Sequence, residues 1–187
     1  MAQQNVFAKL SSKKVRADKY FDDFNYADAL HLYLELYNND PTRKNIALQI
    51  AETYRKLNNV AKTAEWYQIV IDEEDIIQNK HYLFYAQALL ALREYDQAEI
   101  WVKKYKNYSE YDDYSFSSSF EVIDQLLNDE DKLSIEAINI NSPYDESCPV
   151  IFDNALMYMS NKNNTTLIKR TDGWTRYSFH SIYISEK

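Results

Sequence analysis

Five residue positions recur three times along this chain, at spacings of 34 and then 35 residues. In each copy a small residue is followed by a bulky one. A third residue, bulky or β-branched, comes next, and then a second small residue with a bulky one after it. The matched positions are Ala17, Ala51 and Ala86; Tyr20, Tyr54 and Leu89; Tyr26, Val60 and Tyr95; Ala29, Thr63 and Ala98; and Tyr33, Tyr67 and Val102. A period of this length is typical of stacked supersecondary units that share one continuous core.

Each copy is predicted to be a pair of antiparallel helices. Residues 25–41, NYADALHLYLELYNNDP, carry apolar side chains at helical spacing, and Pro41 prevents the helix from continuing. A helix of about 12 residues is marginally stable alone and needs a packing partner. The small residue of one helix allows its partner to approach closely, and the aromatic ring fills the space beside it.

This pattern resembles the tetratricopeptide repeat (TPR) over about residues 10–112. Pro41 stands where the helix-ending proline of that family stands. The chain departs from the family in lacking its early Trp and Gly, in having Thr63 for the second-helix alanine, and in lacking the proline in later copies. The resemblance implies a mainly α fold of three helical hairpins. Apolar residues at helical spacing from Phe116 to Leu127 then predict a helix that closes the solenoid. The predicted solenoid domain covers residues 10–132, and a flexible N-terminal segment, 1–9, precedes it.

The hydrophobic period changes towards two from residue 133. Four β-rich runs follow, around Ile138 and Ile140, over 155–159, over 164–170 and over 179–185, and Asp172-Gly173 is a turn signal. The sequence therefore predicts a small antiparallel β unit over residues 133–187.

Part of this unit resembles one blade of a Tol-type propeller. The matching residues are Pro149, Phe152, Leu156, Tyr158, Ser160, Ile182 and Tyr183. A lone blade leaves open edges, so we expect these residues to begin a propeller within a larger protein.

The order of the elements is similar to the N-terminal part of a PorE-like family of Bacteroidota envelope proteins, associated with type IX secretion. The run Asn139-Ile140-Asn141-Ser142, the turn Tyr144-Asp145-Glu146 and Pro149 match that family. The resemblance implies a periplasmic, outer-membrane-associated scaffold with secretion components as partners. That family ends in an OmpA-like domain, so peptidoglycan would be bound only through a domain absent from these residues.

The residue types that catalysis or metal binding needs do not converge in this sequence. His31, His81 and His180 lie in separate predicted elements, and Cys148 has no neighbouring base. Gly173 is the chain's one glycine, so neither a phosphate-binding loop nor a nucleophile elbow can form. We expect no enzymatic activity, no metal and no cofactor.

The net charge of −8 is concentrated in residues 107–131, which hold eight acidic residues and no basic ones. This segment is interpreted as a solvated acidic cap, with a cation site or a basic partner as the alternative. Nothing in the sequence resembles a basic nucleic-acid footprint, and no apolar run is long enough to span a membrane.

In solenoids of this kind the first helix of each pair lines the concave face. The predicted groove residues are Lys14, Asp18, Phe21, Leu48, Glu52, Arg55, Lys80, Leu83, Gln87 and Leu90. An apolar floor with mixed charges suits a protein or peptide partner. The alternative to the envelope scaffold is a cytosolic TPR adaptor or co-chaperone with a small β tail domain. Chaperone adaptors bind carboxylates through basic groove residues, and Asp18 and Glu52 argue mildly against that alternative.

Overall fold

The computed structural model describes residues 2–107, 136–162 and 171–186 of the chain. Two compact units are separated, Met1–Glu130 and Asp131–Lys187, and each is described by itself. The division lies beside the change of hydrophobic period at residue 133.

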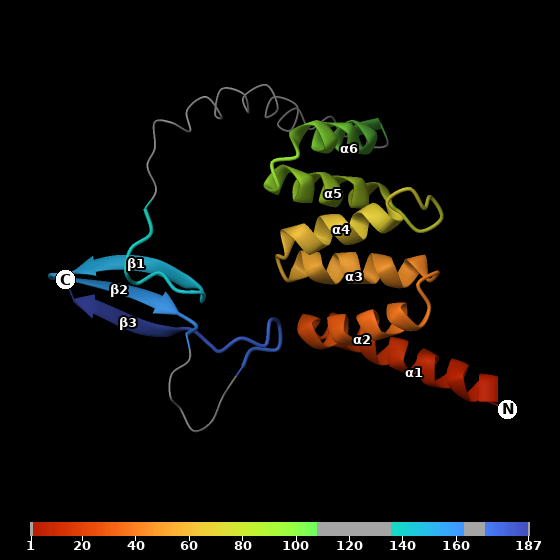
Figure 1. The fold of residues 1–187 in the computed structure, drawn as a ribbon, viewed down its shortest axis with the longest axis horizontal. Helices are drawn as coiled ribbons and strands as arrows, with labels where there is room; N and C mark the ends of the chain where they lie inside the picture. Colours follow the sequence, from red (N-terminus) through yellow and green to blue (C-terminus); the bar gives the residue numbers. More distant parts are fainter. Residues whose placement is uncertain (1, 108–135, 163–170, 187) are drawn as a thin grey trace. The chain divides into compact units, whose positions relative to one another are not determined.

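The described part of the first unit forms six helices that follow one another in a stack (Figure 1). They are α1 (Ala2–Asp22), α2 (Tyr26–Asn39), α3 (Lys44–Lys56), α4 (Val60–Val70), α5 (Asn79–Ala91) and α6 (Tyr95–Asn107). The helices pack as three hairpins, α1 with α2, α3 with α4 and α5 with α6, and α2–α3 and α4–α5 contacts join the hairpins. The predicted helical hairpins are therefore confirmed, whereas the predicted closing helix lies outside the described residues.

The first helix begins at Ala2, which differs from the expected flexible segment over 1–9. Residues 2–9 contain no glycine or proline, so nothing in the backbone stops the helix from extending towards the N-terminus. Within residues 2–107 and the described parts of the second unit, no helix is long and apolar enough to cross a membrane.

The small residues of the repeat lie at the helix contacts. Ala17, Ala51, Ala86, Ala29 and Ala98 are fully buried, and Thr63 is 2% exposed. Two clusters of buried side chains share Tyr37 and Trp66, whose rings meet edge to face with centroids 4.8 Å apart. Tyr37 of α2 thus packs against α4 of the next hairpin, which joins the first two repeats into one core.

Each first helix ends in the same left-handed turn. Phe24, Asn58 and Arg93 have φ values of 61°, 55° and 64°. The amide of the residue after each one donates back to a carbonyl five residues earlier, at 2.8 Å from Asn25 to Tyr20, 3.0 Å from Asn59 to Tyr54 and 2.9 Å from Glu94 to Leu89. This is the Schellman arrangement, in which glycine usually takes the left-handed position.

Replacing Arg93 with glycine is expected to raise the free energy of unfolding by about 1 kcal/mol, because a side chain with a Cβ is disfavoured at positive φ. Chemical denaturation of the full chain measures the effect. The control Arg93→Ala removes the same long side chain but keeps the Cβ, and it should give no such gain. Equal stability of the two variants would contradict the turn geometry.

The described residues of the second unit form a three-stranded antiparallel sheet in the order β1-β2-β3 (Figure 1). The strands are β1 (Glu146–Phe152), β2 (Ala155–Ser160) and β3 (Ser181–Glu186). The pairing of β1 with β2 is irregular between Ser147 and Val150, where Cys148 has a φ of 53°. A bulge there accommodates Pro149, which has no amide proton to donate to the ladder.

The prediction of a strand around Ile138 and Ile140 is wrong. These residues form a turn in which the Asn141 amide donates to the Ile138 carbonyl at 3.0 Å. The Asn141 side chain also accepts from the Ile138 amide at 2.7 Å. A short polar side chain that bonds a backbone group a few residues away favours a turn over a strand.

The turn predicted at Asp172-Gly173 is present. The Asp172 carboxylate accepts from the Thr175 amide and the Thr175 hydroxyl, both at 2.7 Å. A backbone bridge between Thr171 and Ser178 closes the turn. The predicted β-run over 164–170 lies outside the described residues.

Candidate functional site

The ten predicted groove residues lie on the first helix of each hairpin. Lys14, Asp18 and Phe21 are on α1; Leu48, Glu52 and Arg55 are on α3; and Lys80, Leu83, Gln87 and Leu90 are on α5. Nine of them keep part or most of their surface exposed. Leu48 differs because it is only 9% exposed and packs in the core. Its assignment as a groove residue is therefore replaced by that of a core residue.

A tyrosine on the second helix binds a carboxylate on the first helix in two of the three repeats. The Tyr33 hydroxyl donates to Asp18 Oδ1 at 2.8 Å, and the Tyr67 hydroxyl donates to Glu52 Oε1. The partners are 15 residues apart in both cases, so this is one contact made twice. The third repeat has Gln87 and Val102 at the equivalent positions and cannot form it.

These carboxylates also hold the nearby basic side chains. Lys14 Nζ donates to Asp18 Oδ2 at 2.6 Å, and Arg55 Nη2 donates to Glu52 Oε2 at 2.7 Å. The Arg55 guanidinium lies 3.9 Å from the centre of the Phe84 ring on α5. Two of the three predicted groove cations are therefore paired with carboxylates of the same helix.

The ionisation of this cluster is fixed by its contacts. Burial pushes the pKa of Glu52 upwards, but the hydrogen bonds from Arg55 and Tyr67 outweigh that effect and hold the pKa below its ordinary value. Burial, together with the neighbouring Glu52 carboxylate, raises the pKa of Tyr67. Glu52 is therefore ionised and Tyr67 neutral near pH 7, which is the state in which the hydroxyl donates.

A hollow of about 210 Å³ lies between the end of α3, the start of α4 and α5. Its lining residues are Arg55, Asn58, Val60, Thr63, Phe84, Gln87, Ala88 and Ala91. Arg55 and Gln87 belong to the predicted groove set, whereas the other lining residues were not predicted. Ala88 and Ala91 on α5 were the sequence signal for this hollow, because small side chains on a helix leave room beside a larger neighbour.

His81 of α5 has a structural role. Its ring is 5% exposed, and Nδ1 accepts a hydrogen bond from the Gln78 amide at 2.8 Å, which caps the start of the helix. Burial lowers the pKa of His81, so the imidazole is neutral near pH 7. It is a helix-capping residue, in agreement with its predicted assignment as a structural or surface histidine.

We expect stability to fall as the pH drops below about 6.5, because the unfolded chain then takes up a proton at His81 that the folded chain resists. His81→Gln keeps a hydrogen-bond acceptor without titrating in this range, so its stability should depend less on pH between 7 and 5. Thermal unfolding at a series of pH values measures the difference. The control is His31→Gln at an exposed position of α2, and a variant of His81 that keeps the full wild-type slope would contradict the assignment.

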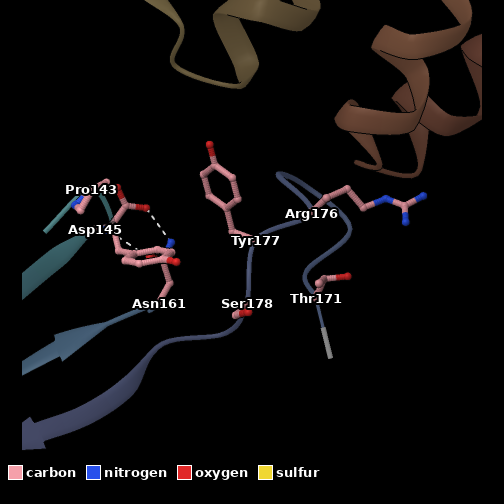
Figure 2. A pocket seen from close by; sticks show the side chains of 8 residues that line it. Pro143, Asp145, Asn161, Thr171, Arg176, Tyr177 and Ser178 are labelled. Carbon is pink, nitrogen blue, oxygen red and sulfur yellow. Dashed lines mark hydrogen bonds between the residues drawn. The ribbon is translucent and has the colours of Figure 1, made fainter. Parts of the chain in front are cut away.

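The second unit has a larger opening, of about 370 Å³ (Figure 2). The Asn161 side chain donates to Asp145 Oδ2 at 2.9 Å and accepts from the Asp145 amide at 3.0 Å. Arg176, from the turn after Thr171, extends away from that pair (Figure 2). The Asp145–Asn161 pair thus fixes the local backbone at the end of β2.

Within the described ranges, no group of three or more His, Cys, Asp or Glu side chains could hold a metal ion. Cys148 is an exposed free thiol at the β1 bulge. The absence of enzymatic activity and of a metal stays a prediction.

No protein-family model matches the chain, and no curated protein matches it. Among solved structures, the first TPR of Spaghetti (RPAP3), bound to the HSP90 peptide SRMEEVD, is 20% identical with a TM-score of 0.49, over 65% of this chain and 94% of that one. The Sgt2 TPR domain from Aspergillus fumigatus is 13% identical with a TM-score of 0.46, over 72% of this chain and 91% of that one. The arrangement of the helices themselves defines the fold class: the chain is mainly α, with three TPR-like helical hairpins and a small antiparallel sheet.

Proposed function

We propose that the helical unit is a non-enzymatic scaffold that binds a segment of a partner protein along α1, α3 and α5. The observation that supports this proposal is the hollow between α3, α4 and α5, which Arg55 and Gln87 of the predicted groove help to line. Its volume of about 210 Å³ can accept one large side chain of a bound peptide.

The chemistry of the hollow favours an apolar side chain. Val60, Phe84, Ala88 and Ala91 supply apolar surface, whereas the amide groups of Asn58 and Gln87 suit the backbone of an extended peptide. Lys14 and Arg55 are paired with Asp18 and Glu52, so an acidic peptide meets few free positive charges. The proposed ligand is therefore a peptide with an apolar or aromatic anchor.

Filling the hollow tests this proposal. Ala91 is exposed and lines the hollow, so Ala91→Phe should block it without disturbing the core. Ala61→Phe makes the same change at an exposed position of α4 that does not line the hollow. The probe is a library of phage-displayed peptides selected on the full chain, followed by calorimetry with the enriched sequences.

Enriched peptides are expected to carry an aromatic or large aliphatic residue, and Ala91→Phe should weaken their binding by tenfold or more, about 1.4 kcal/mol. Ala61→Phe should bind as the wild type does, and the acidic peptide SRMEEVD should not compete. Failure to enrich any peptide, or equal binding by both variants, would contradict the proposed site.

We also propose that the chain acts in the periplasm as part of a PorE-like, outer-membrane-associated scaffold, with type IX secretion components as partners. The support is the sequence resemblance over residues 139–149 and the order of the two units. A cytosolic TPR adaptor is equally consistent with the helical hairpins. Immunoblotting of fractionated source cells separates the two, because recovery in the cytosolic fraction would overturn the envelope assignment.

A further inference from the structure

One face of the sheet carries large apolar residues on all three strands. The strand register places Val150 opposite Met157 and Met157 opposite Ile184, while Met159 lies opposite Ile182. Phe152, opposite Ala155, points to the same side. The apolar sheet face is defined here by these six larger side chains: Val150, Phe152, Met157, Met159, Ile182 and Ile184.

These side chains are largely uncovered. Val150, Phe152, Ile182 and Ile184 are between 57% and 68% exposed, and Met159 is 36% exposed. Large apolar residues scattered singly on a surface are ordinary, but a contiguous patch marks an interaction site.

The opposite face of the sheet is partly covered by its own residues near Tyr158, whereas Ile151 on the same face is 83% exposed. Tyr158 is 5% exposed and stacks on Tyr183 with ring centroids 5.7 Å apart. Lys162 Nζ lies 4.1 Å from the centre of the Tyr183 ring and donates to the Tyr158 hydroxyl at 2.8 Å. The described residues of this unit supply no packing layer over the apolar sheet face, whereas a stable β unit needs an apolar face covered by a second layer.

We propose that the missing layer is the same face of a second copy of this chain. The two sheets would pack face to face about 10 Å apart in a two-fold symmetric sandwich. This homodimer is separate from the peptide site proposed on the helical unit, and either can fail without the other.

The area of the apolar sheet face fits a second copy. Each exposed side chain presents on the order of 100 Å², so the face offers roughly 500 Å² per chain, near the upper limit for an ordinary monomer surface. Two copies together would bury about 1,000 Å², which is the size of a weak, transient interface between proteins and fits a dimer that forms only as the concentration rises.

The chemistry of the apolar sheet face also suits self-association. None of its six side chains is charged, and the one acidic residue in register with them, Glu186, pairs with Ala155 at the end of the strands, so the centres of two identical faces meet without like-charge repulsion. Met157 and Met159 occupy the central strand, and methionine adapts its shape to an opposing copy of itself.

The test is the molar mass of the full chain in solution, from light scattering after size-exclusion chromatography between about 1 and 300 µM. The wild type is expected to approach twice the 22.2 kDa of one chain as the concentration rises. Ile182→Lys places a charge in the apolar sheet face and should weaken dimerisation on the order of 100-fold.

The matched control is Ile151→Lys. Ile151 is 83% exposed on the other edge strand, but its side chain points to the opposite face because it pairs with Leu156. This variant should dimerise as the wild type does. Far-UV circular dichroism checks folding, and Val150→Lys, also on the apolar sheet face, is expected to reproduce the loss of dimer should Ile182→Lys misfold.

Three results would overturn the proposal. A wild-type monomer at every concentration would show that no second copy covers the face. A dimer that survives both Ile182→Lys and Val150→Lys would show pairing through a strand edge or another surface. Equal loss of dimer in Ile151→Lys and Ile182→Lys would show that the face carries no specific contact.

Discussion

Removal of the Tyr67 hydroxyl group, by Tyr67→Phe, is expected to lower the free energy of unfolding by about 1.5–3 kcal/mol, the usual cost of losing a hydrogen bond to a charged group. The Tyr67 ring is fully buried, and the Glu52 side chain that accepts its hydrogen bond is only 15% exposed. Water cannot easily replace the lost donor. Urea denaturation at pH 7 measures the change.

The repeat provides a matched control for this prediction. Tyr33→Phe removes the equivalent hydroxyl in the first repeat, but its acceptor, the Asp18 side chain, is 38% exposed and can bond water instead. The loss should therefore be smaller than at Tyr67. Equal losses at the two positions would show that burial of the carboxylate does not set the strength of the contact.

The effect at Tyr67 should also depend on pH. Because the pKa of Glu52 is held below its ordinary value in the folded chain, its ionised contacts stabilise the fold at neutral pH and are lost as the pH falls through the folded pKa. The gap between wild type and Tyr67→Phe should then shrink below about pH 4.5, the ordinary value. A gap that widens as the pH falls below this value would contradict the charged hydrogen bond.

Enlarging Ala51 to leucine is expected to cost about 1–3 kcal/mol, because the added carbon atoms have no space at the centre of the second hairpin. Ala51 is fully buried on α3 and packs in the same cluster as Ala64 of α4. Differential scanning calorimetry should show a lower melting temperature for this variant.

The control for this substitution is Ala61→Leu, at an exposed position of α4. A change on a helix surface away from special contacts is usually within about 0.5 kcal/mol of neutral. An unchanged melting temperature for Ala51→Leu would mean that the repeat positions do not mark the helix contacts.

The repeat made the helical core predictable. A small residue that recurs every 34 or 35 residues has to lie where two helices meet, and Ala17, Ala51 and Ala86 are fully buried there. The spacing of Tyr33 and Tyr67 also indicated core positions. Their hydroxyl partners, Asp18 and Glu52, were instead assigned to a groove, although the same 15-residue separation in both repeats was visible in the sequence.

Other features had no comparable signal. The left-handed turns at Phe24, Asn58 and Arg93 contain no glycine, so the sequence did not predict them. They are recognised only by their positive φ angles. The alternating Ile-Asn pattern near Ile138 resembled a strand until local hydrogen bonding by Asn141 produced a turn. The hollow beside Phe84 depends on how two hairpins stack, and the pattern within one repeat does not determine that.

The helical unit is a linear stack in which each helix packs on its neighbours in the chain. Hydrogen–deuterium exchange of the full chain, followed by mass spectrometry of its peptides, tests whether each helix is stabilised by these neighbours. We predict the slowest exchange in α3 and α4, faster exchange towards α1 and α6, and faster exchange in the strands of the sheet unit than over residues 45–105. One uniform level of protection across α1 to α6 would contradict a stack stabilised from neighbour to neighbour.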